Sequence, residues 1–73
     1  MRMNQSEARP LVLSLFREWA EANGHSLPIN NDVAIEGYRW IAKEQREALE
    51  FLSGADKSVL IRIWLLKAGL MKP

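Results

Sequence analysis

The side chains of this 73-residue chain that could do acid, base or nucleophilic chemistry are a few hydroxyls, a group of glutamates and one histidine. The candidate nucleophiles are Ser6, Ser14, Ser26, Ser53 and Ser58. None of them stands in a motif with a sequence-local base, and Ser53 and Ser58 are better explained as helix caps. The sequence therefore gives no support for covalent catalysis by serine.

The glutamates in the second half of the chain could in principle act as paired general acids and bases. They are Glu36, Glu44, Glu47 and Glu50. Without histidine or cysteine companions, carboxylates at this spacing are typical of solvated charges one helical turn from Arg39, Lys43 and Arg46. His25 follows Glu21 by four residues, and we interpret it as a helix-end cation, since it has no nucleophile to assist. We expect no enzyme and no catalytic residue.

Metal and cofactor sites are not predicted either. Cysteine is absent, which removes disulfides, and a single histidine cannot complete a closed zinc site. The four glycines are scattered and form no phosphate-binding loop.

Length and charge restrict the remaining possibilities. Seventy-three residues suffice for one domain, whose core alone provides only about 3–5 kcal/mol of stability. The formal net charge is +1, with the two signs interspersed, so no basic patch typical of a nucleic-acid binder is evident. The longest apolar stretch is shorter than a membrane span, and the N-terminus has no signal-peptide pattern. We expect a cytoplasmic protein with no membrane contact.

The elements that must position these side chains are all predicted to be helical. Residues 1–8 lack periodicity and are expected to be a flexible N-terminus, leaving residues 9–73 as a single helical domain. Apolar residues from 10 to 23 occupy one arc of a helix that begins near Pro10 and ends at Asn23-Gly24. In the loop that follows, Leu27 and Ile29 are expected to pack down as anchors.

A second and longer helix is predicted over residues 32–52. Asn30, Asn31 and Asp32 are its candidate caps. The alternative is a short extended piece at Val33–Ile35 with the helix starting near Gly37. Gly37 lies in the apolar arc, where it either permits a close helix approach or marks a kink.

The third helix, predicted over residues 55–71, carries apolar residues on more than one face. The expected core stripe is Val59, Ile63, Leu66 and Leu70. The residues left over, which we predict to form an interface, are Leu60, Ile61, Trp64, Leu65 and Met71. Gly69 is a candidate early end for this helix, with Leu70 and Met71 as a packed tail.

Together these elements predict an all-α, three-helix bundle that forms a homodimer, because the third helix has more apolar surface than one small core needs. Trp40, Glu44 and Lys67 border the predicted interface. Glu44 is either an edge residue paired with Lys67 or Arg62, or part of an aromatic and acidic patch that meets a partner.

We therefore expect a protein–protein interaction module that acts as a regulator, adaptor or inhibitor of another, unidentified protein. Economy of length suggests a phage or mobile-element accessory protein. The alternative is a helix-turn-helix-like DNA-binding regulator that uses residues 46–66, with Lys57, Ser58, Arg62 and Arg46 as contacts. Asp56 and the large aliphatic side chains of the third helix are poor groups to present to a phosphate-lined groove.

Overall fold

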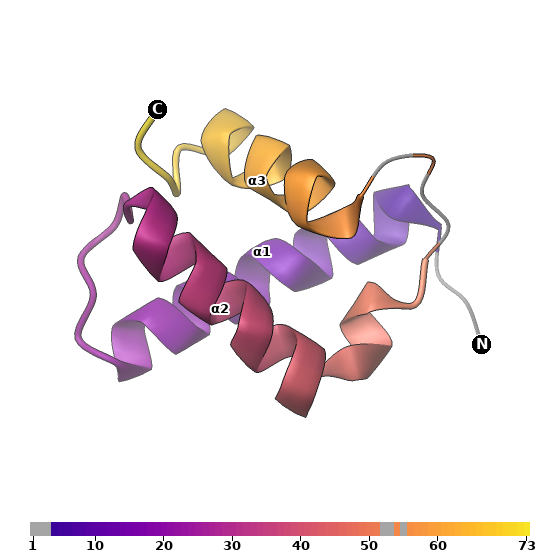
Figure 1. Cartoon of the computed structure of the whole chain (residues 1–73), viewed down its shortest axis with the longest axis horizontal. Helices are drawn as coiled ribbons and strands as arrows, with labels where there is room; N and C mark the ends of the chain where they lie inside the picture. Colours follow the sequence, from indigo (N-terminus) through magenta and orange to yellow (C-terminus); the bar gives the residue numbers. More distant parts are fainter. Residues whose placement is uncertain (1–3, 52–53, 55) are drawn as a thin grey trace.

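The computed structural model describes residues 4–51, 54 and 56–73. It contains three α-helices and one 3-10 turn: α1 (Gln5–Ala22), α2 (Asn31–Glu44), η1 (Arg46–Leu49) and α3 (Lys57–Lys67) (Figure 1). No strand occurs within these residues, apart from one isolated β-bridge. The predicted all-α, three-helix architecture is confirmed, whereas the start of α1, the end of α2 and both ends of α3 differ from the predicted ones by two residues or more.

Helix α1 begins five residues before its predicted start. Asn4 and Glu7 form a capping box, in which the Glu7 amide donates to Asn4 Oδ1 at 2.9 Å and the Asn4 amide donates to Glu7 Oε1 at 3.4 Å. Ala8 is fully buried, which ties this first segment to the core. Residues 5–8 are therefore helical instead of flexible, residues 1–3 lie outside the described range, and Pro10 lies inside the helix.

The end of α1 matches the prediction closely. Gly24 has a φ of +74°, its amide donates to Glu21 O, and the amide of His25 donates to Ala20 O at 2.8 Å. These two bonds are those of a Schellman cap, which requires the left-handed backbone that glycine adopts without steric cost. The His25 ring lies 5.2 Å from the Trp19 ring. His25 thus packs on the end of α1, and of the two predicted loop anchors Ile29 is buried while Leu27 is exposed.

Helix α2 begins where the sequence indicated but ends early. Asn30 caps it through a 2.9 Å bond from the Val33 amide, and the helix runs continuously through Gly37, so the extended alternative at Val33–Ile35 is wrong. The helix stops at Glu44, because Gln45 leaves the helical region with φ −131° and ψ 45°. The turn η1 follows and buries Ala48. The predicted end at Leu52 and the predicted cap Ser53 lie outside the described residues.

Helix α3 is shorter at both ends than predicted. Asp56 is its N-cap, and its carboxylate accepts from the amide of Ser58 at 2.9 Å. Gly69, with φ +75°, ends the helix in a second Schellman cap. The tail then turns inward, burying Leu70 and Met71 as expected.

This tail is tied to the loop between α1 and α2. Ile29 donates to Leu70 O, and Lys72 donates to Ile29 O, each at 2.8 Å. They belong to the isolated parallel bridge between Ile29 and Met71. The loop anchor and the C-terminal tail therefore hold each other in place.

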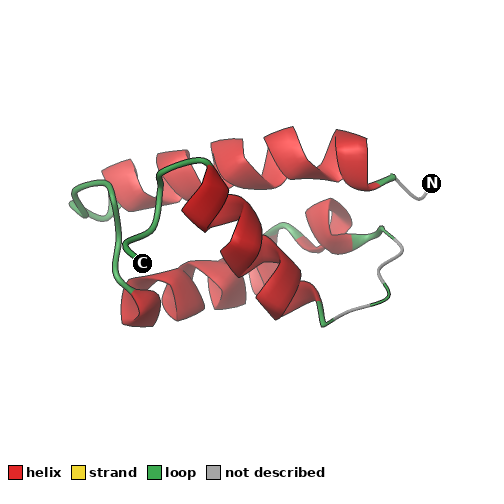
Figure 2. Cartoon of the chain, turned by 90° about the horizontal axis from the view of Figure 1, so that it is seen from above, coloured by secondary structure: helices red, strands yellow, loops and turns green. Residues whose placement is uncertain are grey.

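The core lies where α1, α2, η1 and α3 meet, and α3 runs obliquely to the other two helices (Figure 2). The largest fully buried side chains are Phe16, Ile41, Ile61, Leu65 and Val12. A Cβ added at Gly37 would lie only 2.6 Å from Phe16 Cε1, so the absence of a side chain there permits α1 and α2 to approach closely. This supports the first predicted role of Gly37, close helix approach, and α2 continues without interruption through this residue.

Candidate functional site

The burial of α3 reverses the predicted assignment of its two apolar stripes. Ile61, Trp64, Leu65 and Met71, predicted to be available for an interface, are buried in the core, and Leu60 is half-buried against it. The predicted core residues Val59, Ile63 and Leu66 are exposed instead, and of that stripe only Leu70 is buried. Ile61, Trp64, Leu65 and Met71 are therefore not exposed in the single chain, and the exposed apolar side chains of α3 lie on its opposite face.

On this face a line of aliphatic side chains follows the outside of α3, and we call it the outer stripe. It consists of Val59, Ile63 and Leu66, which are 50%, 41% and 37% exposed. Their spacing of four and three residues places them on one helical face. These are half of the six large hydrophobic residues that are exposed in the described chain.

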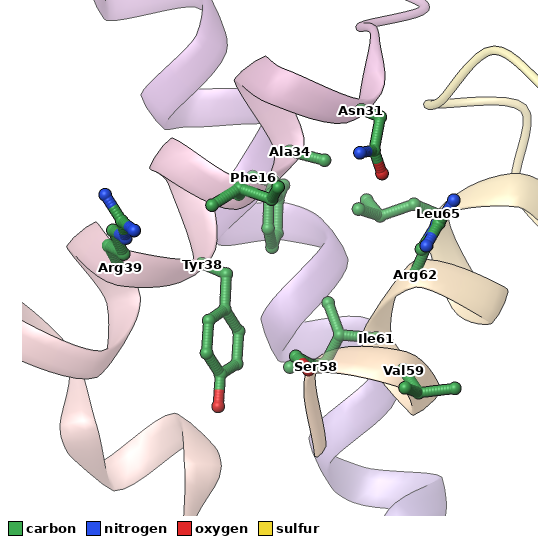
Figure 3. A pocket seen from close by; sticks show the side chains of 11 residues that line it. Phe16, Asn31, Ala34, Tyr38, Arg39, Ser58, Val59, Ile61, Arg62 and Leu65 are labelled. Carbon is green, nitrogen blue, oxygen red and sulfur yellow. The ribbon is translucent and has the colours of Figure 1, made fainter. Parts of the chain in front are cut away.

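Next to the outer stripe lies an open groove of about 380 Å³ between α2 and α3, which we call the α2–α3 groove. Helix α2 contributes Asn31, Ala34, Ile35, Tyr38 and Arg39. Helix α3 contributes Ser58, Val59, Ile61, Arg62 and Leu65, and α1 contributes Phe16 (Figure 3). Val59 belongs to both the groove and the outer stripe, so the two adjoin along α3, with the exposed Arg62 next to both.

The groove is apolar at its floor and basic at its rim. Phe16, Ile61 and Leu65 are almost fully buried and form the floor. Ile35 is 44% exposed at the rim of α2, opposite Val59 on α3. Arg39 and Arg62 are exposed on opposite walls, and the lining includes no carboxylate. Within residues 4–51, 54 and 56–73, neither guanidinium forms an ion pair.

The charges of α3 reinforce this basic character. The helix contains Lys57, Arg62 and Lys67 and no acidic residue. The residue directly before the helix is its N-cap, Asp56. The Ser58 hydroxyl and then the Ser58 amide donate hydrogen bonds to the carboxylate of Asp56 and lower its pKa below the ordinary value of 3.8. Asp56 therefore stays ionised at neutral pH as a cap and is not part of the groove lining.

Of the residues predicted to border an interface, none lines the groove. Trp40 is half-buried against the core, and Lys67 is exposed in the last turn of α3. Glu44 is exposed at the end of α2, where it lines a polar depression of about 340 Å³ together with residues of η1. No ion pair joins it to Lys67 or Arg62 within the described part of the chain. Neither predicted role of Glu44 gains support from this position.

The residues named for the DNA-binding alternative do not form one DNA-facing helix. Arg46 belongs to η1, whereas Lys57, Ser58 and Arg62 belong to α3. The Lys57 ammonium donates to the Leu49 carbonyl and lies 5.1 Å from the centre of the Phe51 ring. Ser58 is bonded to Asp56. Because α2 ends at Glu44, the two helices are not joined by the short turn that this motif requires.

Sequence reasoning missed Ile35, Tyr38 and Arg39 as groove residues and placed Val59 in the core. One signal in the sequence could have corrected the assignment of α3. The stripe with Trp64 has the larger apolar area, and burying the larger stripe gives the larger free-energy gain. The contribution of α2 had no such signal, since it depends on which side of α2 faces α3.

Comparison with protein-family models, with curated proteins and with solved structures found no match. In the part of the chain that the structure describes, no helix combines the length and apolar character needed to cross a membrane. The same residues contain no cluster of three or more histidine, aspartate or glutamate side chains that could hold a metal ion.

Proposed function

We propose that this protein is a small helical interaction module that regulates, bridges or inhibits another protein by binding it through the α2–α3 groove and the outer stripe. The observation that supports this function is the exposed apolar surface of Ile35, Val59, Ile63 and Leu66 beside a groove with a buried apolar floor. Exposed apolar surface of this kind, bordered by polar groups, marks interaction sites in soluble proteins.

The chemistry of the lining favours binding over catalysis. Its polar side chains are two arginines, an asparagine, a serine and a tyrosine, with neither a histidine nor a carboxylate to transfer a proton. Arginine and tyrosine are enriched at protein interfaces, where one side chain combines apolar contact with hydrogen bonding. The groove is thus better suited to hold a partner than to transform a substrate.

A homodimer, expected from the sequence, is a second way to cover this surface. The residues that suggested it are now accounted for in the core of one chain, so the remaining support is the outer stripe alone. Light scattering at micromolar concentration measures the mass directly, and a dimer that Ile63→Asp dissociates would support self-association through this stripe.

The test of the proposed function compares capture of proteins from cells that express the chain. The wild type should retain a protein that Ile63→Asp loses, and the purified pair should bind again in calorimetry. Leu11→Asp is the matched control, because Leu11 is also 41% exposed but lies on α1 outside the groove. The proposal fails if no captured protein distinguishes Ile63→Asp from Leu11→Asp while circular dichroism shows both variants folded.

Titration with random duplex DNA separates the proposal from the DNA-binding alternative. Phosphate contacts weaken steeply with salt, so a DNA-binding regulator should bind at low ionic strength and lose affinity as salt rises. The interaction module should show no such binding. Salt-sensitive DNA binding that requires Arg46 and Arg62 would favour the regulator instead.

A further inference from the structure

The α2–α3 groove and the outer stripe together specify the shape of their occupant. Val59 and Leu66 are seven residues apart, so the stripe extends about 10 Å along the axis of α3, or two helical turns. A small molecule filling the groove would leave Ile63 and Leu66 uncovered, because these residues lie outside the groove lining. A helix with apolar side chains three and four residues apart covers both regions.

The charge of this surface indicates the sign of the charge that a partner should carry. Arg62 lies between the groove and the outer stripe, Arg39 stands on the opposite wall, and Lys67 follows Leu66. Neither the groove lining nor α3 contains a carboxylate, and Glu36, which precedes Arg39 by three residues on α2, forms no ion pair with it within the described residues. Guanidinium groups at the rim of an interface pair with carboxylates of the partner, so an acidic partner is electrostatically complementary.

A second copy of this chain is a poor occupant by the same criterion. Antiparallel packing of two α3 helices around a two-fold axis would bring Val59 of each copy against Leu66 of the other. It would also bring the Arg62 and Lys67 side chains of both copies toward the shared seam, without an acidic residue from either α3. Juxtaposed like charges are unfavourable and suppress such pairing.

Nucleic acid satisfies the charge of this surface but not its apolar part. Phosphates placed against the three exposed aliphatic side chains in the middle of the basic face would lose water without gaining a hydrogen bond or an opposite charge. A peptide can supply apolar side chains and carboxylates from the same helix. The apolar side chains and the basic charge of the surface therefore together favour a helical peptide segment over nucleic acid.

We infer that the α2–α3 groove and the outer stripe bind an acidic amphipathic helix of another protein. Its apolar side chains lie against Val59, Ile63 and Leu66, and its carboxylates pair with Arg39 and Arg62. This inference rests on the proposed function and adds to it the secondary structure and the charge of the partner segment.

The test selects random peptides of about 14 residues on the immobilised full chain and measures their affinities by fluorescence anisotropy at about 0.15 M salt. Selected peptides should be rich in Asp and Glu, with apolar residues at helical spacing. The double variant Arg39→Glu/Arg62→Glu should weaken their binding at least about tenfold, since it replaces two attractions by repulsions.

The matched control is Lys43→Glu/Lys72→Glu, which changes the net charge equally at two exposed lysines outside the groove lining. It should change affinity by less than about twofold, because neither lysine lines the groove and so neither is placed to pair with a carboxylate bound there. Salt also weakens interactions between exposed charges that are not in contact. All four positions are exposed, and circular dichroism verifies that each variant is folded.

Each contrary result has a distinct meaning. Peptides without acidic enrichment that still lose affinity in Ile63→Asp would overturn the acidic partner but leave the proposed function intact. Failure to select any peptide, or peptide affinities that Ile63→Asp leaves unchanged, would overturn both the acidic partner and the proposed function. A dimer that Ile63→Asp dissociates would replace the acidic helix by a second copy, and random duplex DNA that binds more tightly than the peptides would replace it by nucleic acid.

Discussion

The two faces of α3 have similar side-chain chemistry and opposite environments. On the inner face, Ile61, Trp64 and Leu65 are between 1% and 6% exposed. On the outer face, Val59, Ile63 and Leu66 are between 37% and 50% exposed. Both faces consist of large apolar residues at helical spacing, so hydrophobicity alone does not distinguish the structural face from the one available to a partner.

What distinguishes the inner face is the set of contacts made by segments beyond the helix. Phe51, before α3, lies with its ring 5.4 Å from the Trp64 ring. After α3, the Schellman cap at Gly69 turns the chain, and the next two residues, Leu70 and Met71, are buried. The outer face has no such neighbours within the described residues, so its apolar side chains stay exposed.

The largest expected effect comes from matched truncations on the two faces. Leu65→Ala should cost about 2–5 kcal/mol, because it removes a buried side chain and leaves a cavity. Leu66→Ala, one residue away on the outer face, should cost less than about 1 kcal/mol. Urea unfolding followed by circular dichroism measures both, and equal losses would contradict the assignment of the faces.

A smaller loss of stability is expected from a substitution where α2 packs against α1. A Cβ at Gly37 would lie 2.6 Å from Phe16 Cε1 and 3.1 Å from Trp19 Cε3. Gly37→Ala should therefore cost about 1–2 kcal/mol, overpacking outweighing the gain in helix propensity. Gly54→Ala is the control, because a Cβ there has no atom within 4 Å. A Gly37→Ala protein as stable as Gly54→Ala in thermal melts would show that α1 and α2 are less tightly packed.

The two lysines at the ends of α3 extend the comparison to charged residues. Lys57→Met should cost about 1 kcal/mol, since Lys57 donates to the Leu49 carbonyl and lies over the Phe51 ring. Lys67→Met should change the stability by less than about 0.5 kcal/mol, because Lys67 is exposed. Chemical denaturation separates the two, and similar values for both would argue against a structural role of Lys57.

The smallest effect concerns the pH dependence of the α3 cap. The pKa of Asp56 is lowered in the folded protein, so its contribution is fully present above the ordinary value of 3.8 and is lost as the pH falls through the folded value. Asp56→Asn keeps a capping side chain but does not titrate. The stability advantage of the wild type over this variant should therefore shrink between about pH 5 and pH 2. Thermal melts across this pH range measure the stability difference between the two proteins. A difference that stays constant with pH would exclude ionisation of the Asp56 carboxylate as its source.

Local signals in the sequence predicted a large part of the fold. The caps at Gly24 and Asn30, the early end at Gly69 and the burial of Ile29 all follow from residues that act on their own neighbours. The Asn4–Glu7 capping box is just as local, and it was overlooked because residues 1–8 lack an apolar pattern. The end of α2 had no comparable signal, since Gln45, Arg46 and Glu47 are good helix formers.

The candidate site was predictable only in part. The sequence indicated that α3 has two apolar stripes and that one of them exceeds the needs of the core. It did not indicate that Ile35 and Arg39 of α2 would lie across from Val59 and Arg62. Their meeting depends on the angle at which α3 crosses α2, which is set by contacts between residues far apart in the chain.

The sequence by itself determined that the chain is all-α and that α3 is apolar on both sides. It also determined the end of α1, the start of α2 and the early end of α3 at Gly69. These properties depend on capping and periodicity, which act within a few residues. Only the tertiary structure decided that α2 ends at Glu44, which stripe of α3 is buried, and that two arginines border the groove. The physical reason is that burial depends on the packing of Trp64 with Phe51 and of Phe16 with Gly37, contacts that the periodicity of one segment does not contain.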